Sequence, residues 1–117
     1  MGTVETGAQA PRLTLRRGAA DDGVVRVDVT GEVDVGTVPE LRRLITDVCG
    51  EPGVSALLLD FAALRFLDSS GIAALIGGYR TAQERGLRFA VLNSTGSVRN
   101  VLEITGMYEM FAAERQV

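Results

Sequence analysis

Histidine, lysine and tryptophan are absent from this 117-residue chain, which has a single cysteine, Cys49. Without histidine, a Ser-His-Asp triad, a Cys-His pair and a phosphohistidine carrier are impossible. Without lysine, there is neither a Walker A lysine nor a Schiff base. One cysteine and no histidine leave no thiolate or imidazole zinc site, and the acidic residues lack the spacing of an EF-hand loop. We therefore expect a protein that is not an enzyme and holds no metal or cofactor.

Positive charge is also sparse, with a net charge of −3 and no basic cluster larger than a pair such as Arg16-Arg17. This argues against binding to nucleic acid or to an anionic membrane surface. No apolar run approaches the roughly 20 residues of a membrane span. Residues 1–11 lack the features of a secretory signal and are expected to be a disordered tail. Together with the single cysteine, these features favour a cytoplasmic protein with one domain at residues 12–117.

Hydrophobic periodicity predicts alternating strands and helices. We expect strands near residues 13–17, 24–29, 54–61 and 87–92, and helices near 37–49, 69–85 and 98–105. Crossover helices join parallel neighbouring strands, so this order predicts an α/β fold with helices mainly on one face of the sheet. The pattern alone does not fix the strand order. Thr37 is expected to cap the first helix with Glu40 reaching back to it, and Gly77 and Gly78 to permit close packing of the second helix.

The segment Asp68-Ser69-Ser70-Gly71 stands where a buried strand and loop lead into a helix. One interpretation is helix capping alone, because Ser and Asp are preferred cap residues. The other is a modification site, since capping explains only one hydroxyl. A phosphate on Ser70 is compatible with the positive end of a helix, but its charge would hinder a partner docked there.

The segment Gly31-Glu32-Val33-Asp34 ends a strand and enters the first helix. It is either a polar turn or part of a binding surface. Loops at the ends of parallel strands commonly form the binding rim of such folds, which would give Asp34 a role.

Three blocks of the sequence carry a family resemblance. Residues 60–72, which end in Phe-Leu-Asp-Ser-Ser-Gly-Ile, strongly resemble the signature of bacterial anti-sigma factor antagonists. These are single-domain members of the sulfate transporter and anti-sigma factor antagonist (STAS) family. Residues 31–41 and 97–107 also fit this family, and the resemblance covers roughly residues 13–111.

The resemblance implies a STAS-like mixed β-sheet of four to five strands and a role in transcription regulation by partner switching. Family members bind an anti-sigma factor that is a serine kinase, which releases the sigma factor. The kinase phosphorylates the serine before the glycine, here Ser70, and a serine phosphatase reverses this. The implied partner-binding residues are Asp34, Asp68, Ser69, Ser70 and Gly71. ATP belongs to the kinase, so no nucleotide site is implied here.

Two expectations remain open beside this interpretation. Family members end in a further helix, whereas residues 107–117 indicate only a short strand or a loose tail. We therefore expect the last helix to be short or missing, which would expose apolar surface or favour dimers. The alternative function is a STAS scaffold subunit of a stress-signalling complex without a phosphorylation switch. A serine enzyme is disfavoured because no histidine or lysine can activate Ser70.

Overall fold

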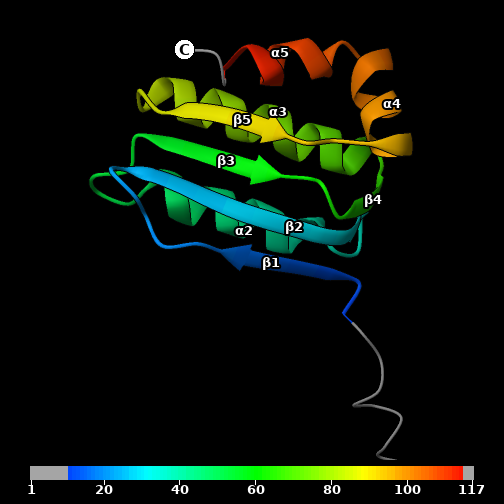
Figure 1. The fold of residues 1–117 in the computed structure, drawn as a ribbon, viewed down its shortest axis with the longest axis horizontal. Coiled ribbons are helices and arrows are strands. Elements are labelled where there is room, and N and C mark those ends of the chain that lie inside the picture. The colour runs from blue at the N-terminus through cyan, green and yellow to red at the C-terminus, as the bar shows by residue number, and fades with distance from the viewer. Residues whose placement is uncertain (1–10, 115–117) are drawn as a thin grey trace, which may run out of the picture.

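A five-stranded mixed sheet and four helices make up residues 11–114, the part of the chain that the computed structural model describes (Figure 1). The predicted tail, residues 1–11, lies outside this part except for its last residue. The elements in chain order are β1 Leu13–Arg17, β2 Val24–Val33, α2 Val38–Cys49, β3 Ala56–Asp60, β4 Leu64–Leu67, α3 Ser69–Glu84, β5 Arg88–Leu92, α4 Gly96–Ile104 and α5 Met107–Glu114.

The sheet has the order β1-β2-β3-β5, and the short strand β4 pairs with the end of β2. β1 is antiparallel to β2, whereas the pairs β2–β3, β3–β5 and β2–β4 are parallel. The α/β class and the mixed sheet expected from the sequence are confirmed.

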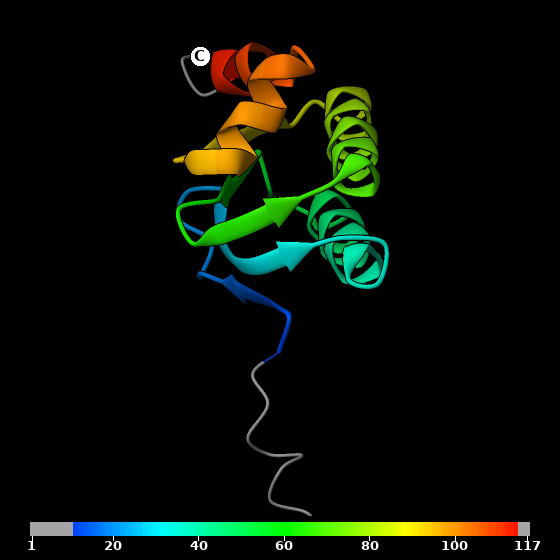
Figure 2. The ribbon, with the colours of Figure 1, turned by 90° about the vertical axis from the view of Figure 1, so that its right-hand side faces the viewer.

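Helices α2 and α3 cover one face of the sheet (Figure 2). The alternation in β2 explains this, because Val25, Val27 and Val29 are fully buried while the residues between them are exposed. In α2, the residues at helical spacing face this core, and Cys49 at its end is buried as well. Burial raises the pKa of the Cys49 thiol, which keeps it protonated and unreactive.

Gly78 allows α3 to lie close to both the sheet and α2. A Cβ at this position would come within 3.0 Å of Ile45 Cγ2 and 3.1 Å of Phe89 Cε2. The close-packing prediction holds for Gly78 but is wrong for Gly77, which is exposed and has open space where its Cβ would stand.

A C-terminal helix is present, contrary to the expected short strand or loose tail. α5 lies along the outer edge of β5 (Figure 1). Its Phe111 is fully buried, with its ring centroid 5.9 Å from that of Tyr79 and 5.8 Å from that of Phe89. This aromatic cluster supplies tertiary packing that a short helix lacks on its own. The apolar edge that a missing helix would have exposed is therefore covered.

The sequence reading also missed β4 and the full length of β2. β2 continues through Val33, so residues 31–33 belong to the strand rather than to a turn. The register shifts between Gly31 and Glu32, and beyond this irregularity β2 pairs with β4. Four residues are too few to show a clear alternation, so the sequence pattern predicts a loop where the structure has β4.

Asp60, at the end of β3, links this strand to β2 and to the residue that follows β5, on the face of the sheet opposite α2 and α3. Its carboxylate forms an ion pair with Arg26 of β2 and accepts hydrogen bonds from Asn93 Nδ2 at 3.1 Å and from the backbone N–H of Ala62 at 2.9 Å. Burial alone would raise the pKa of Asp60, but these three donors outweigh it and hold the pKa below its ordinary value. The ionised form therefore stabilises the fold.

Asp60→Asn is expected to lower the free energy of unfolding at pH 7 by about 1–2 kcal/mol, because it removes a charge-assisted pair. The folded-state pKa lies below the unfolded value, so this contribution is present above the unfolded pKa of about 3.9 and disappears as pH falls through the folded value. Urea unfolding at pH 7 and pH 3 measures the difference from wild type. Asp47→Asn, at an exposed position of α2, is the control; a gap for Asp60→Asn that is equal at both pH values contradicts the prediction.

Candidate functional site

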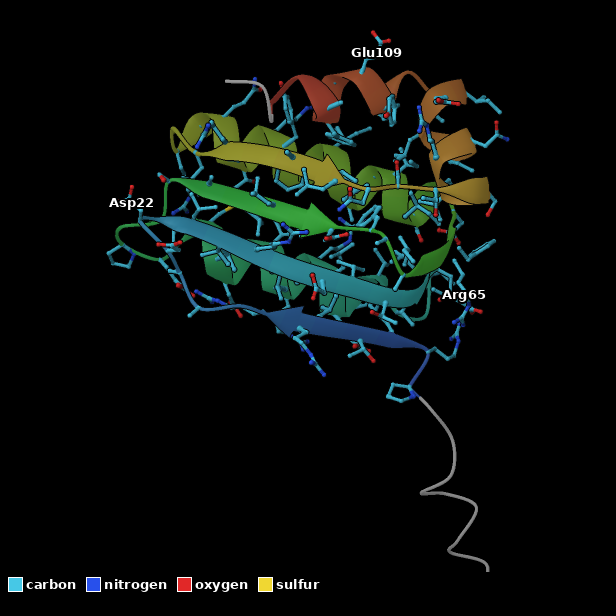
Figure 3. The ribbon with its side chains drawn as sticks, in the orientation of Figure 1. Asp22, Arg65 and Glu109 are labelled. Atoms are coloured by element: carbon cyan, nitrogen blue, oxygen red, sulfur yellow. The ribbon has the colours of Figure 1, made fainter. Side chains whose placement is uncertain are left out.

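The two segments singled out in the sequence meet at one end of the sheet. Val33 at the end of β2 is in register with Leu67 at the end of β4, and the backbone N–H of Asp68 donates to the carbonyl of Val33 at 3.3 Å. The turn that contains Asp34 and the start of α3 therefore lie side by side. Figure 3 marks this end of the sheet by Arg65 of β4, opposite the end that carries Asp22.

Asp68 is the N-cap of α3, as the capping interpretation predicts. One oxygen of its carboxylate, Oδ1, accepts from the Ser70 backbone N–H at 2.9 Å, the Gly71 N–H at 3.2 Å and the Ser70 hydroxyl at 2.5 Å. The hydroxyl bond, together with these backbone N–H groups, holds the pKa of Asp68 below its ordinary value. The carboxylate is thus ionised and satisfies two of the free N–H groups at this helix end.

The two serines of this segment differ in their surroundings. Ser69 is exposed, whereas Ser70 is half-buried and has its hydroxyl oriented by Asp68. Both hydroxyls lie in the first turn of α3, where the backbone N–H groups and the helix dipole favour negative charge. A phosphate in this turn is therefore electrostatically compatible with the helix.

Gly71 brings the start of α3 into direct contact with the sheet. A Cβ here would stand 2.4 Å from Leu67 Cδ1 and 2.9 Å from Val33 Cγ1, closer than such atoms ever approach. Gly71 is itself buried, so its place in the site is structural. It fixes how far Ser69 and Ser70 stand from the ends of β2 and β4.

Asp34, rather than Thr37, organises the turn before α2. Asp34 Oδ1 accepts from the backbone N–H groups of Gly36 at 2.9 Å and Thr37 at 3.1 Å. The Thr37 hydroxyl accepts from the Asp34 N–H at 3.0 Å and donates to the Glu32 carbonyl at 2.9 Å. Thr37 is the N-cap residue of α2, as predicted, but its side chain makes no capping hydrogen bond, because this hydroxyl is buried and directed back into the turn. The result is a rigid turn that presents Asp34 at the end of the sheet.

Two arginines flank these acidic residues, and the sequence reading missed both. Arg12 forms an ion pair with Asp34 and approaches Glu32 at 3.9 Å, while Arg65 approaches Glu32 from the other side at 3.7 Å. The antiparallel register of β1 and β2 places Leu13 opposite Gly31, and hence Arg12 opposite Glu32. The pairing of β1 with β2 is what brings Arg12 to the acidic residues. The sequence alone does not give the register of this pair, so it could not predict the contact.

Two large apolar side chains are exposed near these polar groups. Val35, in the turn after β2, is 77% exposed, and Phe66, opposite Glu32 in the β2–β4 register, is 45% exposed. Apolar side chains beside charged ones are typical of surfaces that dock another protein. Sequence reasoning missed them because a single apolar residue in a turn or in a very short strand is as consistent with the core as with the surface.

Within residues 11–114, no three His, Cys, Asp or Glu side chains are grouped so that they could hold a metal ion. Across the same residues, no helix combines the length and apolar character that crossing a membrane requires.

Comparison with known proteins gives consistent matches. The family model described as the STAS domain matches residues 19–117. The anti-sigma F factor antagonist of Paenibacillus polymyxa is 26% identical over 88 residues, which covers 75% of this chain and 75% of that protein.

Solved structures of similar proteins share the fold over most of the chain. An anti-sigma factor antagonist from Mycobacterium paratuberculosis is 31% identical, with a TM-score of 0.71 over 87% of this chain and 86% of that one. The anti-sigma factor antagonist SpoIIAA in its unphosphorylated form is 25% identical, with a TM-score of 0.72 over 81% of this chain and 83% of that one. This chain belongs to the STAS domain family, and these relatives are anti-sigma factor antagonists.

Proposed function

We propose that this protein is an anti-sigma factor antagonist that binds an anti-sigma factor serine kinase and thereby releases a sigma factor. Phosphorylation of Ser70 ends this binding, and a serine phosphatase restores it. The names of the relatives support the antagonist role, and one of them is described in an unphosphorylated form. The single observation that carries the proposal is the half-buried, oriented Ser70 hydroxyl at the start of α3, beside an exposed rim.

The rim around Ser70 has the composition of a protein-docking surface. Val35 and Phe66 offer apolar area, while Asp34 and Glu32 hold arginines in defined positions. The turn and the helix start that present these groups are fixed by backbone hydrogen bonds. A preorganised surface loses little conformational entropy when a partner binds. The preorganised surface therefore supports an interaction role. We place this role in the cytoplasm because transcription takes place there.

Phosphorylation of Ser70 is expected to weaken docking of the partner while it leaves the fold intact. The modification adds about −1.5 to −2 charges, which the N-terminus of α3 accommodates. A docked partner has no such compensation, because a like-charge contact at about 4 Å costs roughly 1–4 kcal/mol depending on exposure. Desolvation of the phosphate in an interface with a partner adds to this cost. Affinity then falls by orders of magnitude while the fold persists.

The chemistry of the modification needs no catalytic group from this chain. The Ser70 oxygen attacks the γ-phosphorus of ATP held by the kinase, forming the Oγ–P bond as the bond to ADP breaks and the hydroxyl proton is released. Hydrolysis by the phosphatase breaks the same Oγ–P bond and returns the hydroxyl together with inorganic phosphate. This chain is the substrate of both reactions.

Variants at Ser70 test the docking proposal. Ser70→Ala is expected to bind the anti-sigma factor kinase permanently, even with ATP present, because it has no hydroxyl to modify. Ser70→Asp is expected to bind at least about tenfold more weakly, equivalent to 1.4 kcal/mol, with a Tm within about 5 °C of wild type. Isothermal titration calorimetry with the kinase gives the affinities. Ser55→Asp, at an exposed position before β3 at the opposite end of the sheet, is the control for added charge and is expected to bind as wild type does. Wild-type affinity of Ser70→Asp contradicts the proposal.

Mass spectrometry tests the modification itself. Incubation of the full chain with ATP and the kinase is expected to add about 80 Da, and peptide fragmentation to place this mass on Ser70 rather than on the more exposed Ser69. Ser70→Ala should gain no mass, whereas Ser69→Ala should gain as much as wild type. Tight binding without any mass gain would instead favour the scaffold alternative.

A further inference from the structure

The Ser70 hydroxyl and the α3 cap share a single oxygen atom. Asp68 Oδ1 accepts a hydrogen bond from the Ser70 hydroxyl at an oxygen–oxygen distance of 2.5 Å. The same oxygen accepts hydrogen bonds from the backbone N–H groups of Ser70 and Gly71. The hydroxyl separation lies at the short end of the range for an O–H···O hydrogen bond. The acceptor of the phosphate and the cap of the helix are therefore directly coupled.

We propose that phosphorylation of Ser70 displaces the Asp68 carboxylate from the N-terminus of α3, so that the phosphate takes over the N–H groups of Ser70 and Gly71. The inference rests on the proposed function for one point only, the identity of Ser70 as the modified residue. It goes beyond that proposal because it assigns a change of cap to the modification.

Two consequences of the modification drive this exchange. Phosphoryl transfer replaces the hydroxyl hydrogen with phosphorus, so Ser70 Oγ no longer donates and cannot stay 2.5 Å from Asp68 Oδ1. The phosphate also brings a larger negative charge than the carboxylate and three acceptor oxygens to the same N–H groups. Since Asp68 is only half-buried, its side chain can rotate into solvent, where water replaces the lost donors.

The exchange changes the surface by more than the added phosphate. An ionised carboxylate whose charge was stabilised by three hydrogen-bond donors becomes a solvent-exposed negative charge at the edge of the docking surface. Repulsion of a partner then comes from two groups, Ser70 phosphate and Asp68, of which only one carries the modification. Removal of the phosphate regenerates the hydroxyl donor, which allows Asp68 to return to the cap.

A thermodynamic cycle on the full chain tests the exchange without any kinase or partner. Phosphoserine is placed at position 70 during translation, and Asp68→Ala is made with and without it. In the unmodified chain, loss of the cap is expected to lower the Tm by about 4–8 °C. In the chain with phosphoserine 70, where the cap is the phosphate, the same substitution is expected to leave the Tm unchanged or to raise it. An equal fall of the Tm in both backgrounds overturns the proposal.

Nuclear magnetic resonance gives a second, direct readout. With phosphoserine at position 70, the amide protons of Ser70 and Gly71 are expected to titrate with the phosphate, at a midpoint near its second pKa of about 6. If the chemical shifts of these amide protons do not change as the phosphate titrates, the proposal is overturned as well.

Phosphoserine at position 69 is the matched control, because Ser69 is exposed and its neighbour's hydroxyl remains bonded to Asp68. In that chain, Asp68→Ala should lower the Tm as it does without phosphate. If the chain with phosphoserine 70 fails to fold, the proposal requires Asp68→Ala to restore folding, and continued unfolding contradicts it. Failure of the kinase and binding experiments would leave every result of this cycle unaffected.

Discussion

The close contact of Gly71 with Val33 and Leu67 is the constraint on which the site depends. It joins the first turn of α3 to the ends of two parallel strands, and any side chain at position 71 would force the Leu67 and Val33 side chains to shift. The Asp68 backbone bond to Val33 forms within this contact. The serine segment and the Asp34 turn, far apart in sequence, become one surface for this reason. Packing between helix and sheet thus determines what the polar groups can do.

Elements with a strong local pattern could be predicted from the sequence. The alternation in β2 and the apolar faces of α2 and α3 were sufficient to place them, and Asp68 was recognisable as a cap from its position before α3. α5 escaped prediction because its stability comes from Phe111 packing against Tyr79 and Phe89, which are remote in sequence. β4 is defined by its pairing with β2.

The residues of the site divide in the same way, into those with a local sequence pattern and those placed by contacts between distant segments. Asp34, Ser69 and Ser70 belong to motifs that can be read directly, and the structure places them at one end of the sheet. Arg12 and Arg65 were not predictable, because strand register decides that they face Glu32. Thr37 is the N-cap residue of α2, but its side chain does not make the expected capping bond for a related reason. Its hydroxyl satisfies the Glu32 carbonyl inside the turn, and a preference for capping residues says nothing about such a competing acceptor.

The cover that α5 provides over β5 has a consequence for how the sheet meets other chains. A strand at the margin of a sheet carries free N–H and carbonyl groups that can recruit a foreign strand. Along β5, the helix stands in the way of such an addition (Figure 1). At the opposite margin, β1 presents the exposed Arg16 and Arg17, the latter paired with Glu51, and charged side chains on an outer strand oppose templated growth. Within the described residues, both margins therefore carry features that disfavour the addition of a further strand, a packed helix along β5 and charged side chains on β1.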